Sequence, residues 1–134
     1  MRLRLVLSLA LLAASTPAIA EDWKPVPGDS TSYFDNDFLK VDQASGLIVL
    51  RYAIGTARGA GYKDWPAGKS PIMMYAVDCI SDVWIDLGLD FDGKAGLPKD
   101  WRQMPRETGI ELAVGGAGKA ACERKDELPK AALP

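Results

Sequence analysis

The sequence predicts an α+β domain: a mostly antiparallel β-sheet with a C-terminal α-helix packed on one face and tied to it by a disulfide. Three observations support this fold class. Apolar residues alternate with period two through most of the chain before residue 92, as in half-buried strands. An apolar stripe with helical spacing follows residue 108. Cys79 and Cys122, the only two cysteines, come at the end of an expected strand and near the end of the expected helix.

Residues 1–20 have the three parts of a secretory signal peptide. Arg2 and Arg4 supply positive charge, Leu5 to Ala14 form an apolar run, and residues 18–20 form a small-residue cleavage site. We expect cleavage after Ala20. The apolar run is shorter than the roughly 20 residues of a membrane-spanning helix, and no cysteine follows the cleavage site to accept a lipid. The expected location is therefore the periplasm, the medium or the cell surface, without a membrane span or a lipid anchor.

The rest of the chain is expected to form a single domain over residues 21–122, followed by a flexible charged tail. The tail, residues 123–134, lacks aromatic residues and contains prolines, so we predict no regular structure for it. The net charge of −2 becomes −4 when Arg2 and Arg4 leave with the signal peptide. A negative charge disfavours nucleic acid as a partner, because nucleic-acid binding depends on basic surfaces.

Five segments are expected to form strands: residues 23–26, 31–35, 46–54, 72–79 and 83–91. The 46–54 segment is largely apolar on both faces, which favours a central position in the sheet. In the 83–91 segment, strict alternation places Ile85, Leu87 and Leu89 toward the core and Asp86 and Asp90 toward solvent.

A C-terminal helix is expected to begin near Thr108, because Thr108 and Glu111 have the spacing of a capping box. Its apolar stripe consists of Ile110, Ala113, Val114, Ala117 and Ala121, with Cys122 at the edge. Three glycines at positions 115, 116 and 118 each weaken a helix by about 1 kcal/mol relative to alanine. The helix is therefore expected either to break near the glycine pair or to depend on close contact with the sheet.

Cys79 and Cys122 are predicted to form a disulfide, since exported proteins fold in an oxidising compartment. A bridge closing a loop of about 43 residues would contribute roughly 4 kcal/mol to stability in the chain-entropy model. The alternative is two separate buried thiols. A zinc site is disfavoured by the absence of histidine, and a redox motif by the absence of C-x-x-C spacing.

The absence of histidine also disfavours an enzyme, because it removes the usual base for a serine or cysteine nucleophile. Asp90 and Asp92 could form an acid and base pair or a cation site, but solvated carboxylates at a strand end are the simpler interpretation. We expect no catalytic residue, no metal and no cofactor. A histidine-free hydrolase remains as a distant alternative.

Residues 55–71 form a long connection between two expected central strands, and long connections in small domains are often functional. This segment contains the candidate binding residues Arg58, Tyr62, Lys63, Trp65 and Lys69. Cations beside amphipathic aromatics suit the recognition of proteins or of polyanionic glycans. The alternative is a hairpin in which Trp65 folds back and covers the sheet.

The order of several motifs resembles the surface-adhesin protein E family of exported bacterial proteins. The motifs are Trp23, Tyr33 to Asp35, the strand from Leu47 to Ile54, Tyr75 to Cys79, Trp101 with Met104 and Pro105, and a helix ending at Cys122. The resemblance implies a small antiparallel sheet with a disulfide-tied helix, binding of host extracellular-matrix proteins such as vitronectin and laminin, and possible dimerisation. A weaker resemblance, to the cryptic neisserial protein type, implies an exported protein without an assigned activity. The leading hypothesis is thus a non-catalytic, adhesin-like binding module, and the alternative is a periplasmic envelope protein with an unknown protein partner.

Overall fold

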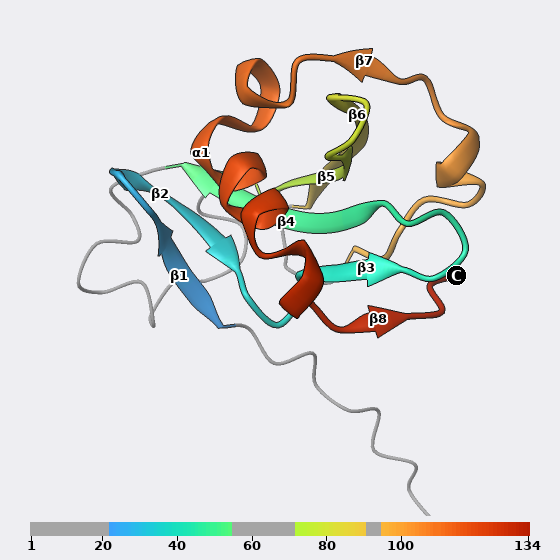
Figure 1. Cartoon of the computed structure of the whole chain (residues 1–134), viewed down its shortest axis with the longest axis horizontal. Helices are drawn as coiled ribbons and strands as arrows, with labels where there is room; N and C mark the ends of the chain where they lie inside the picture. The colour runs from blue at the N-terminus through green and yellow to red at the C-terminus, as the bar shows by residue number, and fades with distance from the viewer. Residues whose placement is uncertain (1–21, 55–71, 91–94) are drawn as a thin grey trace, which may run out of the picture.

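The alternating segments of the sequence form the central strands of a sheet with one α-helix on its face (Figure 1). The computed structural model describes residues 22–54, 72–90 and 95–134. The strands are β1 Trp23–Val26, β2 Asp29–Asp35, β3 Lys40–Asp42, β4 Ile48–Ile54, β5 Ile72–Asp78, β6 Val83–Asp90, β7 Glu107–Thr108 and β8 Lys130–Ala131; the helix is α1 Ile110–Glu123. Short 3-10 turns lie at Trp101–Gln103 and Lys125–Glu127.

Within the described residues, eight strands form one sheet with the main order β1-β2-β4-β5-β6-β7, and β4 lies at its centre. One edge of β4 pairs with β5, while β2 and β3 pair with different halves of the other edge. All described pairs are antiparallel except β3 with β8. The predicted fold class is therefore confirmed: a mostly antiparallel sheet carries a C-terminal helix.

An apolar cluster lies on each face of the sheet, because β4 and β5 present apolar side chains on both sides. On the α1 face, Ile48, Leu50 and Val77 pack with the helix stripe of Ile110, Val114, Ala117 and Ala121. On the opposite face, Val49, Ala76, Ile85 and Leu87 pack around Trp101, which is fully buried. Trp101 thus anchors the long connection between β6 and β7.

A β-bulge in β6 overturns the strict alternation expected for that strand. Met74 pairs with Gly88 and Tyr75 with Asp86, so Leu87 is an extra residue with no opposite partner in the register. Gly88 has a φ of +98°, which glycine adopts without the Cβ penalty of other residues. The extra residue reverses the faces beyond it. Leu89 is therefore 53% exposed and Asp90 is buried, the opposite of the prediction.

Helix α1 begins differently from the capping-box prediction. Thr108 lies in β7, and the residue before the helix is Gly109, with no side-chain cap of its own. The cap comes instead from the turn before β6, where the Asp82 carboxylate accepts the Ile110 N–H at 3.1 Å. The helix is broken at Gly115, whose φ and ψ of 56° and −145° are not helical, so the expected break near the glycine pair is confirmed.

Residues after α1 are ordered into regular structure, which corrects the expectation of a tail without it. Leu128 is buried in the cluster on the α1 face, and β8 adds a parallel strand to β3. Figure 1 shows β8 running beside β3 along one side of the molecule. The sequence did not predict β8 because this strand is only two residues long and is held mainly by main-chain hydrogen bonds, which leave no pattern of side chains.

Candidate functional site

The predicted binding residues Arg58, Tyr62, Lys63, Trp65 and Lys69 lie outside the described residues. The structure does show where their segment is attached. Residues 55–71 connect the end of β4 to the start of β5, and these neighbouring strands pair from Ile48 with Val77 to Tyr52 with Met73. The segment therefore joins the ends of two central, buried strands.

The predicted disulfide between Cys79 and Cys122 is present. The Cα atoms are 5.6 Å apart, within the usual range for a disulfide, and the bridge joins the end of β5 to the last turn of α1. It lines an open hollow together with Asp82, Glu111 and Lys119. The bridge therefore holds the C-terminal half of α1 against the sheet, beyond the break at Gly115.

Arg51 lies on the face opposite α1 and forms a buried charge cluster with Asp35 and Asp90. All three side chains have no exposed surface. Arg51 Nη1 lies 3.7 Å from Asp35 Oδ2, and Arg51 Nη2 lies 3.5 Å from Asp90 Oδ2. Both distances are longer than that of a close charge-assisted hydrogen bond. Arg51 Nη2 also donates to the Ala95 carbonyl at 3.1 Å, and the guanidinium lies over the Phe38 ring, 4.2 Å from its centre.

This cluster ties β2, β4 and β6 together through charge. Asp35 Oδ1 accepts main-chain N–H groups of Asp22 and Asp37 as well. Sequence reasoning did not find the cluster. Arg51 itself could have indicated the cluster. It is the one charged residue in a strand that is apolar on both faces, and burying a charge is costly unless an acidic side chain pairs with it. Asp90 was assigned to solvent because the bulge at Gly88 leaves no mark in the apolar pattern.

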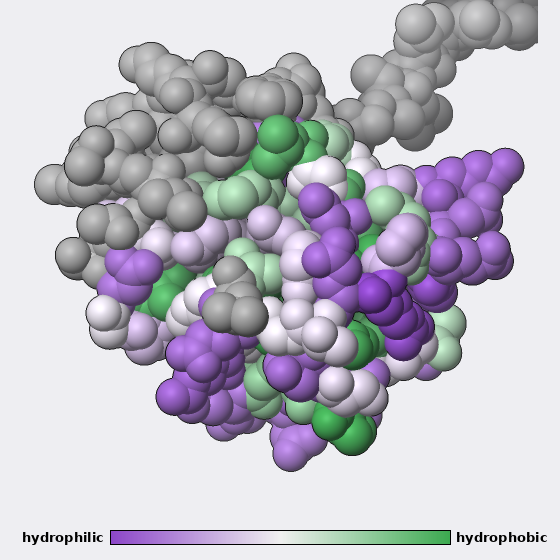
Figure 2. Space-filling model, turned by 90° about the horizontal axis from the view of Figure 1, so that it is seen from above, coloured by the Kyte–Doolittle hydropathy of each residue, from purple (hydrophilic) through white to green (hydrophobic). Residues whose placement is uncertain are grey.

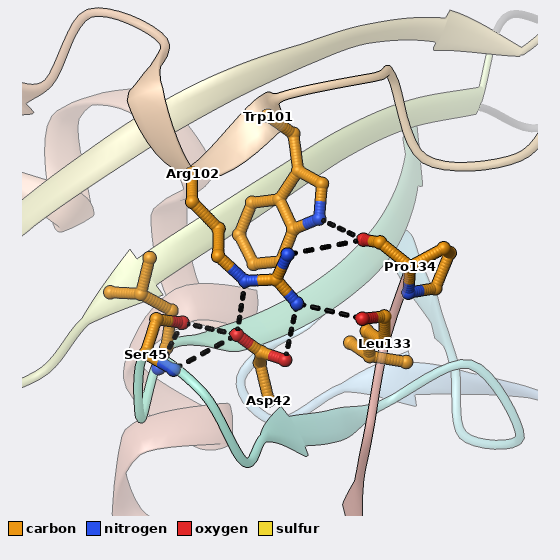
Figure 3. A network of polar contacts seen from close by, with 7 residues as sticks. Asp42, Ser45, Trp101, Arg102, Leu133 and Pro134 are labelled. Carbon is orange, nitrogen blue, oxygen red and sulfur yellow. Dashed lines mark hydrogen bonds and ion pairs between the residues drawn. The ribbon is translucent and has the colours of Figure 1, made fainter.

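A second polar network joins β3 to the Trp101–Gln103 turn (Figure 3). Arg102 donates from Nε to Asp42 Oδ2 and from Nη2 to Asp42 Oδ1, both at 2.8 Å, in the two-pronged geometry that suits a carboxylate. Ser45 supplies two more donors to Asp42 Oδ2, its main-chain N–H at 3.0 Å and its hydroxyl at 2.5 Å. The buried Asp42 carboxylate thus accepts four hydrogen bonds, three at Oδ2 and one at Oδ1.

These contacts set the protonation of Asp42. The hydrogen bonds from Arg102 hold the pKa of the Asp42 carboxyl far below its ordinary value; burial opposes this shift, and the bonds from Ser45 reinforce it. Asp42 therefore stays ionised in the folded protein throughout the physiological range.

The same turn holds residues 129–134, which we call the strap. Arg102 Nη2 donates to the Leu133 carbonyl at 2.8 Å, and Arg102 Nη1 donates to the main-chain oxygen of Pro134 at 3.3 Å. Trp101 Nε1 donates to the same Pro134 oxygen at 2.9 Å. Figure 3 shows these oxygens directed toward the indole and the guanidinium. The side chains of Trp101 and Arg102 thus hold the strap through the main-chain oxygens of Leu133 and Pro134.

The described surface is mixed in character. Figure 2 shows polar side chains interspersed with small apolar areas on one face. Large apolar side chains that are well exposed in the described parts are Ile80, at 88%, and Leu89. Ile80 is in the turn between β5 and β6, whereas Leu89 is displaced outward by the bulge.

Comparisons with known proteins found no family model, no curated protein and no solved structure that matches this chain. Among residues 22–54, 72–90 and 95–134, no group of three acidic or cysteine side chains is arranged to hold a metal ion. In those same ranges, no helix has the length and apolar character needed to cross a membrane.

Proposed function

We propose that this protein is an exported, non-catalytic binding module for a protein partner. The observation that carries the proposal is the attachment of residues 55–71 to the paired, buried strands β4 and β5. A rigid scaffold that presents one long, cation- and aromatic-rich segment is a common arrangement for recognition. The partner surface is assigned to Arg58, Tyr62, Lys63, Trp65 and Lys69.

Export is supported by the disulfide and by the signal-like residues 1–20. Disulfides persist in oxidising compartments and are rare in the cytosol. The Cys79–Cys122 bridge in a chain whose start resembles a signal peptide is therefore best explained by export. Amino-terminal sequencing of exported material should give Glu21 as the first residue, and a retained Met1 would contradict the proposed export route.

The proposed partners are host extracellular-matrix proteins, as the resemblance to the surface-adhesin protein E family implies. The test is capture of vitronectin and laminin by the oxidised mature chain, residues 21–134, compared with a matched variant in which Arg58, Lys63 and Lys69 are alanine. Capture that depends on these three cations supports the assignment. Capture that is equal for both chains would remove the segment from the proposal.

The second candidate is an envelope protein with a periplasmic partner. Cell fractionation separates the two, because an adhesin must reach the cell exterior whereas an envelope factor stays between the membranes. A pulldown from envelope extract with the same pair of chains then tests whether the same segment recognises a periplasmic protein.

A further inference from the structure

Strand β6 is paired along the whole of one edge and along only part of the other. On the first edge, β5 pairs with β6 from Val83 to Asp90. On the second edge, β7 pairs only with Val83 and Trp84. In the parts of the chain that the structure describes, residues 85–90 therefore have no strand on that second side. We call this outer side of residues 85–90 the β6 edge.

Strand β7 ends early for a local reason. Its register with β6, continued by two residues, would place Pro105 opposite Asp86. Proline has no N–H group to donate to a neighbouring strand, so the ladder cannot continue through it. The preceding chain leads instead to Trp101, which is buried on the face opposite α1. An open hollow of about 400 Å³ lies beside the β6 edge as a result, lined by Asp86, Leu87, Gly88, Met104, Pro105 and Glu107.

The face opposite α1 contributes apolar side chains to this hollow. Leu87 is buried in the cluster around Trp101, and Met104 packs against the same cluster. Successive side chains of a strand point to opposite faces of the sheet. A strand laid along the β6 edge would therefore direct every second side chain to this face, where an apolar side chain fits best.

The α1 face of the same edge is acidic. Asp86 lies directly opposite Tyr75, which belongs to the cluster on the α1 face. Glu107 lies directly opposite Trp84, which packs against that cluster. Directly opposite residues share a face of the sheet, so both carboxylates lie on the α1 face, and both residues are exposed. Asp86 Oδ1 accepts the Gly88 N–H at 2.8 Å, which holds this carboxylate at the edge.

The two carboxylates decide which kind of strand the edge can accept. None of the ion pairs among the described residues uses Asp86 or Glu107. A second copy that paired its own β6 edge here would bring two Asp86 carboxylates to the same face of neighbouring strands, where like charges are destabilising. Basic side chains on that face would be stabilised by the same carboxylates. Charge complementarity therefore favours a basic segment over a second copy.

We propose that the β6 edge binds an extended segment of a separate protein, in which basic and apolar side chains alternate, as one further strand of the sheet. The basic side chains meet Asp86 and Glu107, and the apolar side chains enter the hollow beside Leu87 and Met104. The main chain pairs with β6, as in other domains that add a peptide strand to a sheet edge. This inference rests on the proposed function as a protein-binding module and adds a second contact surface to it.

The test uses the oxidised mature chain and a fluorescent peptide, Lys-Val-Lys-Val-Lys-Val with both ends blocked, in fluorescence polarisation. The peptide should bind saturably, and a peptide with glutamate in place of each lysine should not bind. Asp86→Asn with Glu107→Gln removes both charges, and the new Asn side chain can still accept the Gly88 N–H. This variant should bind the lysine peptide about fivefold more weakly, the size expected from two exposed ion pairs.

The matched control is Glu123→Gln with Asp126→Asn, which removes two exposed carboxylates elsewhere on the surface. It has the same net charge as the first variant and should bind the lysine peptide like the unchanged chain. An equal loss of binding in both variants would overturn the proposal, because the attraction would then depend on net charge. Equal binding of the lysine and glutamate peptides would also overturn it and would leave Asp86 as a charge that protects an edge strand from aggregation.

Two methylated peptides test whether the segment pairs as a strand. One has N-methyl groups on its lysines and the other on its valines, so each lacks the N–H groups of one strand edge. One of the two should bind at least about tenfold more weakly and the other should keep its affinity, whereas an equal effect of both would contradict strand pairing. Dimers of the unchanged chain that the lysine peptide dissociates would make a second copy the occupant and would overturn the proposal. Matrix-protein capture through residues 55–71 does not use the β6 edge, so either proposal can fail alone.

Discussion

Arg102 and Asp42 form a two-pronged ion pair in which both carboxylate oxygens lie 2.8 Å from guanidinium nitrogens. The pair joins β3 to the turn that follows β6, across 60 residues of sequence. It also fixes the guanidinium that holds Leu133 and Pro134. Loss of the pair should therefore affect the stability of the domain and the attachment of the strap together.

The low pKa of Asp42 predicts a specific pH dependence of stability. A carboxyl whose pKa is lowered by folding stabilises the folded state above its unfolded pKa, about 3.9, and loses that contribution as the pH falls further. Asp42→Asn should lower the melting temperature at pH 7, and the gap from the unchanged chain should narrow below about pH 4. Thermal unfolding between pH 2 and pH 7 measures this.

The matched control is Asp126→Asn, which removes a carboxylate from an exposed position. At pH 7 its melting temperature should lie close to that of the unchanged chain, because surface substitutions usually change stability little. A gap for Asp42→Asn that stays constant down to pH 2 would contradict the assigned role of the ionised carboxylate.

The Cys79–Cys122 bridge predicts a large loss of stability when either sulfur is removed. Its 43-residue separation gives an expected loss of roughly 4 kcal/mol for Cys79→Ser with Cys122→Ser, in the chain-entropy model. Chemical denaturation of both chains measures the loss. Adding a reductant should destabilise the unchanged chain and leave the double variant unaltered, whereas two alkylated cysteines in folded, unreduced protein would refute the bridge.

The buried cluster predicts that Arg51 cannot be replaced by a neutral residue without cost. Arg51→Met leaves Asp35 and Asp90 without this cation in the interior, and breaking a buried ion pair in this way typically costs about 3–5 kcal/mol. Denaturant unfolding should show such a loss. The triple variant Asp35→Asn, Arg51→Met and Asp90→Asn carries no buried charge at these positions and should recover part of it. No recovery would mean that packing, not charge, explains the effect.

The sequence predicted the elements whose apolar pattern is long enough to read. A repeating apolar pattern over seven or more positions predicts strands β4, β5 and most of β6, and the stripe of the helix. The two cysteines alone predict the disulfide. Strands β7 and β8 have two residues each, too few for a period. The bulge at Gly88 and the capping of α1 by Asp82 depend on contacts between distant segments, which no local pattern contains.

The polar networks were missed for the same physical reason. Arg51, Asp42 and Arg102 each look like ordinary charged residues in sequence, because burial and pairing arise only when the sheet forms. The strap was assigned to a flexible tail since its ordering comes from donors on β3 and on the Trp101–Gln103 turn, not from its own side chains.

The assignment of Trp65 to the partner surface predicts little effect of Trp65→Ala on stability. The competing interpretation, in which Trp65 covers the core, predicts a loss of about 2 kcal/mol or more and a melting temperature several degrees lower. Thermal unfolding of Trp65→Ala distinguishes the two. A large decrease would remove Trp65 from the binding residues.

The most direct test of the central claim is surface plasmon resonance of the mature chain on immobilised vitronectin and laminin, at low and physiological salt. We expect saturable binding that weakens with salt and is lost when Arg58, Lys63 and Lys69 are alanine. If these three cations form a partner surface, the melting temperature of this variant should change little, because exposed charges usually contribute under about 1 kcal/mol. Saturable binding that the triple variant retains in full, or no saturable binding to either matrix protein or to any envelope protein, would contradict the account.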